Sequence, residues 1–296
     1  MGYSDHIKGI LLTFVAVLIL SPDALLVRLI QADVWTLLFW RCLLTGVMMS
    51  FFLAIRYRRQ FFESFYAIGG TGLVSALMII VGSLLFIGSL KQTAAANTLV
   101  ILAAAPIFSS LLSWLILREK IPLRTKLAIF ACFGGILLIF SGSLQSGLLM
   151  GDLMALGATA MWGSNVAIIR SGKSVNMIPA NVIGNLSVAP IVYFLGAQPL
   201  LVSSVDAGFL LLLGLVVLPV SFAMITLSPR YLQAPEVSLI LLIETVLGPI
   251  WVWLALGEVP HTRTVIAGLL ILGTLLIHTL LSLRAPSPPV AIGHSS

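Results

Sequence analysis

Three ionisable side chains stand inside apolar stretches that are long enough to cross a lipid bilayer: Asp23, Arg41 and Glu244. A charge at bilayer depth is costly, so such residues pair with one another or face a watered path. On such a path they would hold a charged group of a solute or carry a proton. In the packed alternative, Arg41 pairs with one of the two carboxylates and stabilises the bundle.

Two further candidates, Asn97 and Glu236, lie 139 positions apart, each close behind small residues near the start of an expected helix. A carboxylate in a first helical turn is stabilised by the macrodipole, which by itself explains Glu236. The amide of Asn97 is able to bond across helices or to a solute.

A third group follows the middle of the chain, where Trp162 and Asn165 flank Gly163. This stretch fits either a cavity wall or close packing of small residues. Asn185 lies one turn after Asn181, so the two share a helix face that should point away from lipid. The residues expected to bind the solute or line its path are Asp23, Arg41, Asn97, Trp162, Asn165, Asn185, Glu236 and Glu244.

Sequence signatures of catalysis are missing. The chain has no G-x-x-x-x-G-K-[ST] loop, no H-E-x-x-H and no G-x-S-x-G. Its two cysteines, Cys42 and Cys132, lie in apolar runs without metal-ligand spacing, which predicts packing residues. We therefore expect no enzyme, no catalytic residue, no metal and no cofactor.

Composition points to the bilayer as solvent. Of 296 residues, 59% are hydrophobic and only 9% are charged, whereas soluble domains carry about 25% charged residues. The net charge of +6 would suggest nucleic acid in a soluble protein, but here the basic residues fall in short gaps between apolar runs. That pattern is typical of topology signals, so lipid and not nucleic acid is the expected partner.

The apolar runs and the turn or charge signals between them predict an all-α membrane protein with ten transmembrane helices. The expected ranges are about 8–29, 34–55, 66–90, 94–117, 125–141, 150–170, 178–197, 207–228, 235–256 and 263–284. The Pro- and Ser-rich tail 285–296 is predicted to be disordered.

The distribution of Lys and Arg predicts that both termini are cytoplasmic in a multi-pass protein of the inner membrane. With that orientation, three basic residues face outward, namely Arg28, Lys91 and Arg263, and Arg41 lies within a helix. The other twelve of the sixteen face inward: Lys8, Arg56, Arg58, Arg59, Arg118, Lys120, Arg124, Lys126, Arg170, Lys173, Arg230 and Arg284.

The sequence contains an internal repeat. A constant offset of 139 superimposes residues 91–119 on 230–258, pairing Lys91 with Arg230 and Glu119 with Glu258. The repeat unit then holds five helices, 8–141 and 150–284. Because five is odd, the second copy must cross the membrane in the opposite direction. The sequence therefore predicts two inverted five-helix repeats, an architecture typical of transporters.

The duplicated segments resemble the EamA-type domains of ten-helix members of the drug/metabolite transporter superfamily. The best motifs are Ala105–Phe108 running to Leu117–Glu119, and Glu244–Val246 running to Leu256–Glu258. Relatives usually have Pro after the first Glu of the second copy; here Thr245 stands there and Pro249 follows one turn later. The resemblance implies a transporter for a small metabolite and favours export.

We expect a secondary active or facilitative transporter that moves a small polar metabolite, an amino acid or related compound, by alternating access. It would work as a monomer or homodimer. Two other classes stay open at this stage: a non-transporting subunit of a membrane complex, and a membrane-embedded enzyme acting on lipid-linked substrates.

Overall fold

The computed structural model describes residues 3–117, 123–171, 177–228, 231 and 234–284, and every regular element in these ranges is a helix. The tail 285–296, predicted to be disordered, lies outside the described residues. The first half contains α1 (Tyr3–Leu20), α2 (Asp23–Leu29), α3 (Val34–Tyr57), η1 (Arg58–Gln60), α4 (Phe61–Tyr66), α5 (Gly69–Gln92), α6 (Ala95–Leu102), α7 (Ala105–Leu117) and α8 (Leu123–Ser146).

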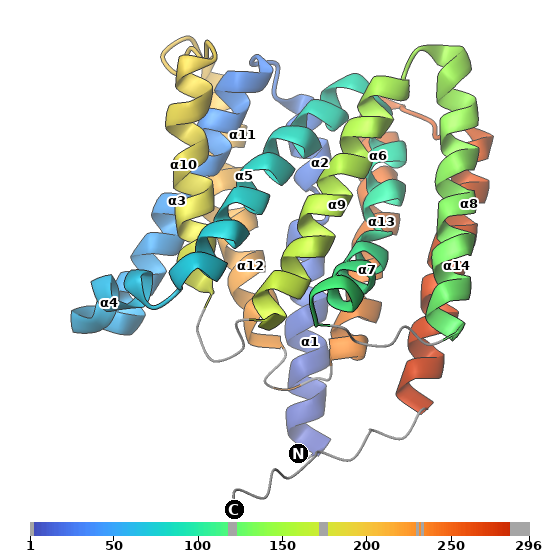
Figure 1. The fold of residues 1–296 in the computed structure, drawn as a ribbon. Coiled ribbons are helices and arrows are strands. Elements are labelled where there is room, and N and C mark those ends of the chain that lie inside the picture. Colours follow the sequence, from blue (N-terminus) through green and yellow to red (C-terminus); the bar gives the residue numbers. More distant parts are fainter. Residues whose placement is uncertain (1–2, 118–122, 172–176, 229–230, 232–233, 285–296) are drawn as a thin grey trace, which may run out of the picture.

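The second half contains α9 (Leu149–Ser171), α10 (Ile178–Phe194), α11 (Ser204–Leu211), the π-helical turn η2 (Leu212–Val217), α12 (Leu218–Leu227), α13 (Ala234–Leu256) and α14 (Thr262–Arg284). Across the described residues, eight helical segments are long and apolar enough to span a bilayer, and Ile178–Phe194 and Ile240–Leu256 are shorter apolar helices. The chain is a multi-pass membrane protein, and α1 begins at the end of the bundle where α14 finishes (Figure 1).

Two helices that were expected to be continuous are broken. The range 8–29 divides into α1 and α2 at Ser21–Pro22, and 94–117 divides into α6 and α7 just before Pro106. Proline has no backbone N–H and disfavours helical geometry in the preceding residue, so each proline starts a new helix. As a result, α2 and α6 form the upper part of their crossings in Figure 1, and α1 and α7 form the lower part.

Helices that pack together have counterparts in the other half of the chain that also pack together. α5 packs against α9, and their counterparts α12 and α1 also pack against each other. In the same way α7 packs on α9 and α13 packs on α1, while α3 pairs with α10 and α8 pairs with α14. The two halves therefore use one packing scheme.

The interior holds two large hydrophobic clusters. One joins α2, α3, α5, α10 and η2 and contains Cys42, and the other joins α6, α8, α9 and α14 and contains Cys132. Both cysteines are free and fully buried, which confirms that they are packing residues. These clusters fix the helices that carry the polar residues described next.

Candidate functional site

A buried ion pair lies in the interior where α2 begins. Arg41 Nη2 on α3 donates to Asp23 Oδ2 at 2.8 Å. Asp23 is 6% exposed and Arg41 is 5% exposed. The break at Pro22 makes Asp23 the first residue of a new helix and places its carboxylate inside the bundle. Arg41 thus has the carboxylate partner that the packed alternative required.

Aromatic rings extend this pair toward α9. The Arg41 guanidinium lies 5.6 Å from the centroid of the Phe86 ring, and the Phe86 ring lies 5.0 Å from that of Trp162. A cation over an aromatic face is stabilised by the ring quadrupole. Phe86 therefore connects two of the predicted site residues, Arg41 and Trp162.

Glu244 lies at the middle of α13, half-buried, and α13 packs against α2, the helix that begins at Asp23. We call Asp23, Arg41 and Glu244 the central charged cluster. With all three groups ionised, its two carboxylates and one guanidinium leave one net negative charge. Asp23 Oδ1 and Arg41 Nε are also buried without a hydrogen-bond partner. A buried net charge is costly, so the cluster calls for a proton or a cationic group.

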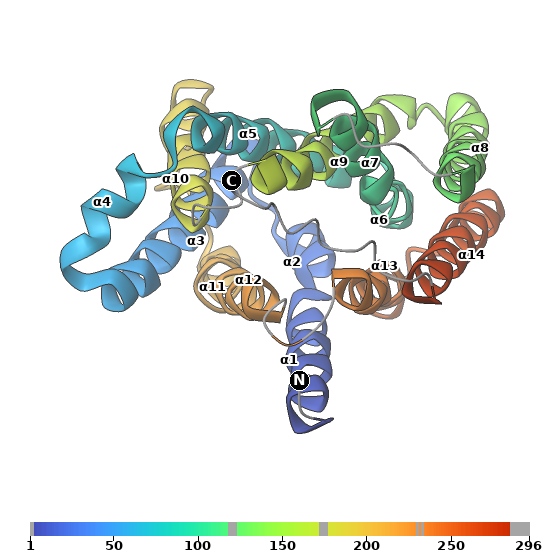
Figure 2. The same cartoon turned by 60° about the horizontal axis from the view of Figure 1, so that its bottom comes forward.

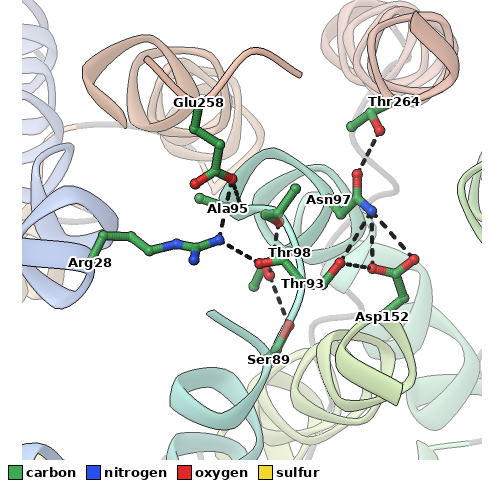
Figure 3. Close-up of polar contacts among 10 residues, drawn as sticks. Arg28, Ser89, Thr93, Ala95, Asn97, Thr98, Asp152, Glu258 and Thr264 are labelled. Carbon is green, nitrogen blue, oxygen red and sulfur yellow. Dashed lines mark hydrogen bonds and ion pairs between the residues drawn. The ribbon is translucent and has the colours of Figure 1, made fainter. Parts of the chain in front are cut away.

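A second polar cluster, which we call the Asn97 cluster, consists of Thr93, Asn97, Ser143, Asp152 and Thr264. Figure 3 shows Thr93, Asn97, Asp152 and Thr264 of this cluster. Asp152 is fully buried and accepts hydrogen bonds from Thr93 Oγ1 at 2.6 Å and from Asn97 Nδ2 at 3.1 Å. Asn97 Nδ2 also donates to Ser143 Oγ at 3.3 Å, and Thr264 Oγ1 donates to Asn97 Oδ1 at 2.5 Å. The cluster ties α6 to α8, α9 and α14.

A cavity of about 370 Å³ adjoins the Asn97 cluster. Its lining residues are Asn97, Ile139, Gly142, Ser143, Ser146, His261, Thr262, Arg263 and Thr264. This volume lies in the range of small-molecule sites. Asn97 is a predicted site residue that lines this cavity.

Near the same cluster, Glu258 joins three parts of the chain (Figure 3). Its Oε1 accepts a hydrogen bond from Arg28 Nη2 at 3.2 Å and another from the Ala95 amide at 2.8 Å, at the start of α6. Arg28 Nη2 also donates to the Thr93 carbonyl at 2.5 Å. Lys91 Nζ donates to the Ile30 carbonyl nearby. We call this side of the bundle the Arg28 end.

The other predicted residues are placed separately. Asn165 is buried and its Oδ1 has no hydrogen-bond partner, while Asn185 donates to the Asn181 carbonyl of its own helix at 2.9 Å. At Gly163 the helices pack closely, as in the small-residue alternative, because a Cβ there would lie 2.3 Å from the Ala105 carbonyl oxygen. The side chain of Glu236 lies outside the described residues.

Sequence reasoning missed Asp152 and the bridging role of Glu258. An acidic residue in the first turn of a helix is ordinarily explained by the macrodipole, and that applies to Asp152 in α9. The sequence did carry a signal for Asp152, because it is an acidic residue in the same apolar run as Trp162 and Asn165. In the sequence, Glu258 looks like an ordinary helix-end residue, and its bond to Arg28 becomes visible only in the structure.

Comparisons with known proteins agree with this geometry. A crystal structure of another protein has a TM-score of 0.65 and 16% sequence identity, over 94% of this chain and 99% of its own, and thus shares the fold. No curated protein matches the sequence. The sequence pattern of the EamA-like transporter family matches residues 7–141 and 149–280, which together are most of the chain. The protein is a membrane transporter of the EamA-like family.

Proposed function

We propose that this transporter has ten membrane crossings in two inverted five-helix repeats and moves a small polar metabolite by alternating access. Eight long apolar segments and two shorter helices support the ten crossings. The exchange of packing partners between the halves supports the inverted repeat. In such transporters the solute site lies near the midplane between the repeats, and rocking of one repeat exposes it to each side in turn.

The observation that carries the proposal is the central charged cluster, because its members come from both halves of the chain. Asp23 and Arg41 belong to the first half, and Glu244 belongs to the second. Charges at membrane depth are retained where a solute or an ion needs them. Trp162 and Phe86 supply an apolar wall beside Arg41.

The chemistry of this cluster favours an amino acid or related compound as the solute. An ammonium group would meet the Asp23 and Glu244 carboxylates, and a carboxylate group would meet the Arg41 guanidinium. When no solute is bound, a proton on Glu244 would neutralise the negative charge that the ammonium group of a bound solute neutralises. Glu244 is therefore the candidate for proton coupling. The family resemblance supports export as the direction.

We assign the protein to the inner membrane with both termini in the cytoplasm. The support is the distribution of basic residues: three at the Arg28 end and twelve expected at the other. The short α4 and η1, which carry Arg58, Arg59 and exposed aromatic rings, lie at the end where α1 begins (Figure 1). That composition is typical of a membrane interface.

Transport by the purified protein in liposomes tests the proposal. Uptake of labelled amino acids and other small polar metabolites should exceed that of protein-free liposomes and be competed by the unlabelled solute. A matched sample carrying Arg41→Gln should lose this uptake. If neither protein takes up any compound of a metabolite library above the level of protein-free liposomes, the proposed function is contradicted and a non-transporting subunit is favoured.

A further inference from the structure

We propose that Glu258 closes a gate at the Arg28 end, and that release of its bond to Arg28 is the step that opens this end. The inference rests on the proposed alternating access, and it names the residues that hold one of the two closed positions. It concerns a bridge made by other residues than those of the central charged cluster, so it can be tested without knowledge of the solute.

The bridge joins the two halves of the chain through one oxygen atom. Glu258 follows α13 in the second half, while Arg28 ends α2 and the Ala95 amide starts α6 in the first. Oε1 of Glu258 accepts hydrogen bonds from both (Figure 3). Moving Glu258 away therefore breaks a charge-assisted bond and uncaps α6 together.

The exposure of this bridge suits a contact that must break and form again. The side chains of Arg28 and Glu258 are 21% and 28% exposed, against 6% and 8% for Arg41 and Asp23. A partly exposed ion pair is weak, while a buried pair is costly to open. Arg28 Nε is buried without a hydrogen-bond partner, and both hydrogen bonds found for this guanidinium are donated by Nη2.

Several other bonds between the halves of the chain also lie at this end. The Gln31 amide donates to Asp206 Oδ1 at 3.0 Å, and the bonds from Thr93 to Asp152 and from Thr264 to Asn97 also cross between the halves. These contacts add to the hydrogen bonds that hold the Arg28 end of the bundle together.

The packing of the broken helices differs between the two ends. At the Arg28 end, α6 packs against α5, α9, α13 and α14, and α2 packs against α5, α11 and α13. At the other end, α7 packs chiefly against α9, and α1 packs chiefly against α12 and α13. Figure 2 shows α5, α9 and α7 along one side and α12, α1 and α13 along the other. Among the described residues, contact across the molecule is thus concentrated at the Arg28 end.

Distances between paired spin labels in the full-length protein, reconstituted in nanodiscs with Cys42 and Cys132 replaced by alanine, test the gate. One pair, at Gln92 and Val259, reports the Arg28 end, and a second pair, at Ile7 and Leu115, reports the opposite end; Gln92, Val259, Ile7 and Leu115 are all exposed. In Glu258→Gln protein, the first pair should gain a longer distance and the second a shorter one. Loss of one charged hydrogen bond should change the ratio of the two populations roughly tenfold.

Arg28→Gln is the second variant, because it removes the same bond while leaving the α6 cap in place. Arg28→Gln removes both the bond to Glu258 and the bond from Arg28 to the Thr93 carbonyl, so the double variant should open no further than Arg28→Gln alone. Asp33→Asn is the matched control: this acid lies at the same end but caps its own helix through Trp35 and Thr36, and Asn caps equally well. Its distances should equal those of the parent. Unchanged distances in both folded bridge variants would overturn the gate, whereas altered distances without any transported solute would instead count against the proposed function.

Discussion

Arg124 and Arg263 make the same contact at opposite ends of the molecule. Arg124 Nη1 at the start of α8 donates to the Leu281 carbonyl of α14 at 3.2 Å, and Arg263 Nη1 at the start of α14 donates to the Ser141 carbonyl of α8 at 2.8 Å. The two arginines are 139 positions apart, which is the offset of the sequence repeat. An axis in the membrane plane, which the proposed inverted repeat requires, would exchange such contacts.

The first prediction concerns orientation. Single cysteines at Leu200 and Arg59, on a background without Cys42 and Cys132, should react differently with an impermeant maleimide in intact cells. Leu200 is 94% exposed beyond α10, and Arg59 is exposed in η1. Leu200→Cys should label and Arg59→Cys should label only after the membrane is opened. The reverse result would invert the proposed topology.

A second prediction compares the two ion pairs. Asp23→Asn leaves Arg41 buried and unpaired, which should lower stability by about 3–5 kcal/mol. Arg28→Gln breaks the partly exposed pair and should cost about 0–1 kcal/mol. Thermal unfolding of both proteins in the same detergent measures the difference. Equal melting temperatures would show that the Asp23–Arg41 pair does not support the fold.

The third prediction concerns close packing of α7 on α9. In Gly163→Ala, the new Cβ would lie 2.3 Å from the Ala105 carbonyl oxygen and 2.9 Å from Phe108 Cβ, so one helix must shift. We expect a loss of about 1–3 kcal/mol. Gly134→Ala is the matched control, because its Cβ would have no neighbour within 4 Å. Its melting temperature should stay level or rise, since Ala is the better helix former.

Much of the helix arrangement could be predicted from sequence. Apolar runs separated by charged turns give the helices, since hydrocarbon tolerates only residues of that kind. The offset of 139 was visible because both copies keep a basic residue at one end and Glu at the other. Pro22 and Pro106 lie within two of these runs, but a proline is compatible with a kink or a full break. Packing decides between them, so the division into α2 and α6 was not predicted.

The site was predicted less completely, because partners are chosen by tertiary contact. Arg41 was expected to have a carboxylate partner, and either Asp23 or Glu244 would satisfy that rule. Helix geometry selects Asp23. Similarly, 55 positions separate Asn97 from Asp152 and 230 separate Arg28 from Glu258. No periodicity within one helix links residues at such distances, so these contacts emerge from the fold alone.

The last prediction concerns Glu244. If its carboxylate carries the coupling proton, Glu244→Gln should abolish uptake driven by a pH gradient in liposomes. Counterflow, in which unlabelled solute exchanges for labelled solute, should persist, because Gln keeps the shape and cannot titrate. If Glu244 is only a second negative charge near the Asp23–Arg41 pair, the same change leaves that pair neutral, so the melting temperature should stay level or rise and both modes of transport should persist.

Asp206→Asn is the control for that experiment, since Asp206 is a buried acid near the Arg28 end that binds the Gln31 amide. An amide oxygen still accepts that bond, so gradient-driven uptake should be retained at a reduced or equal rate. Gradient-driven uptake with unchanged pH dependence in a normally stable Glu244→Gln protein would exclude Glu244 as the proton carrier.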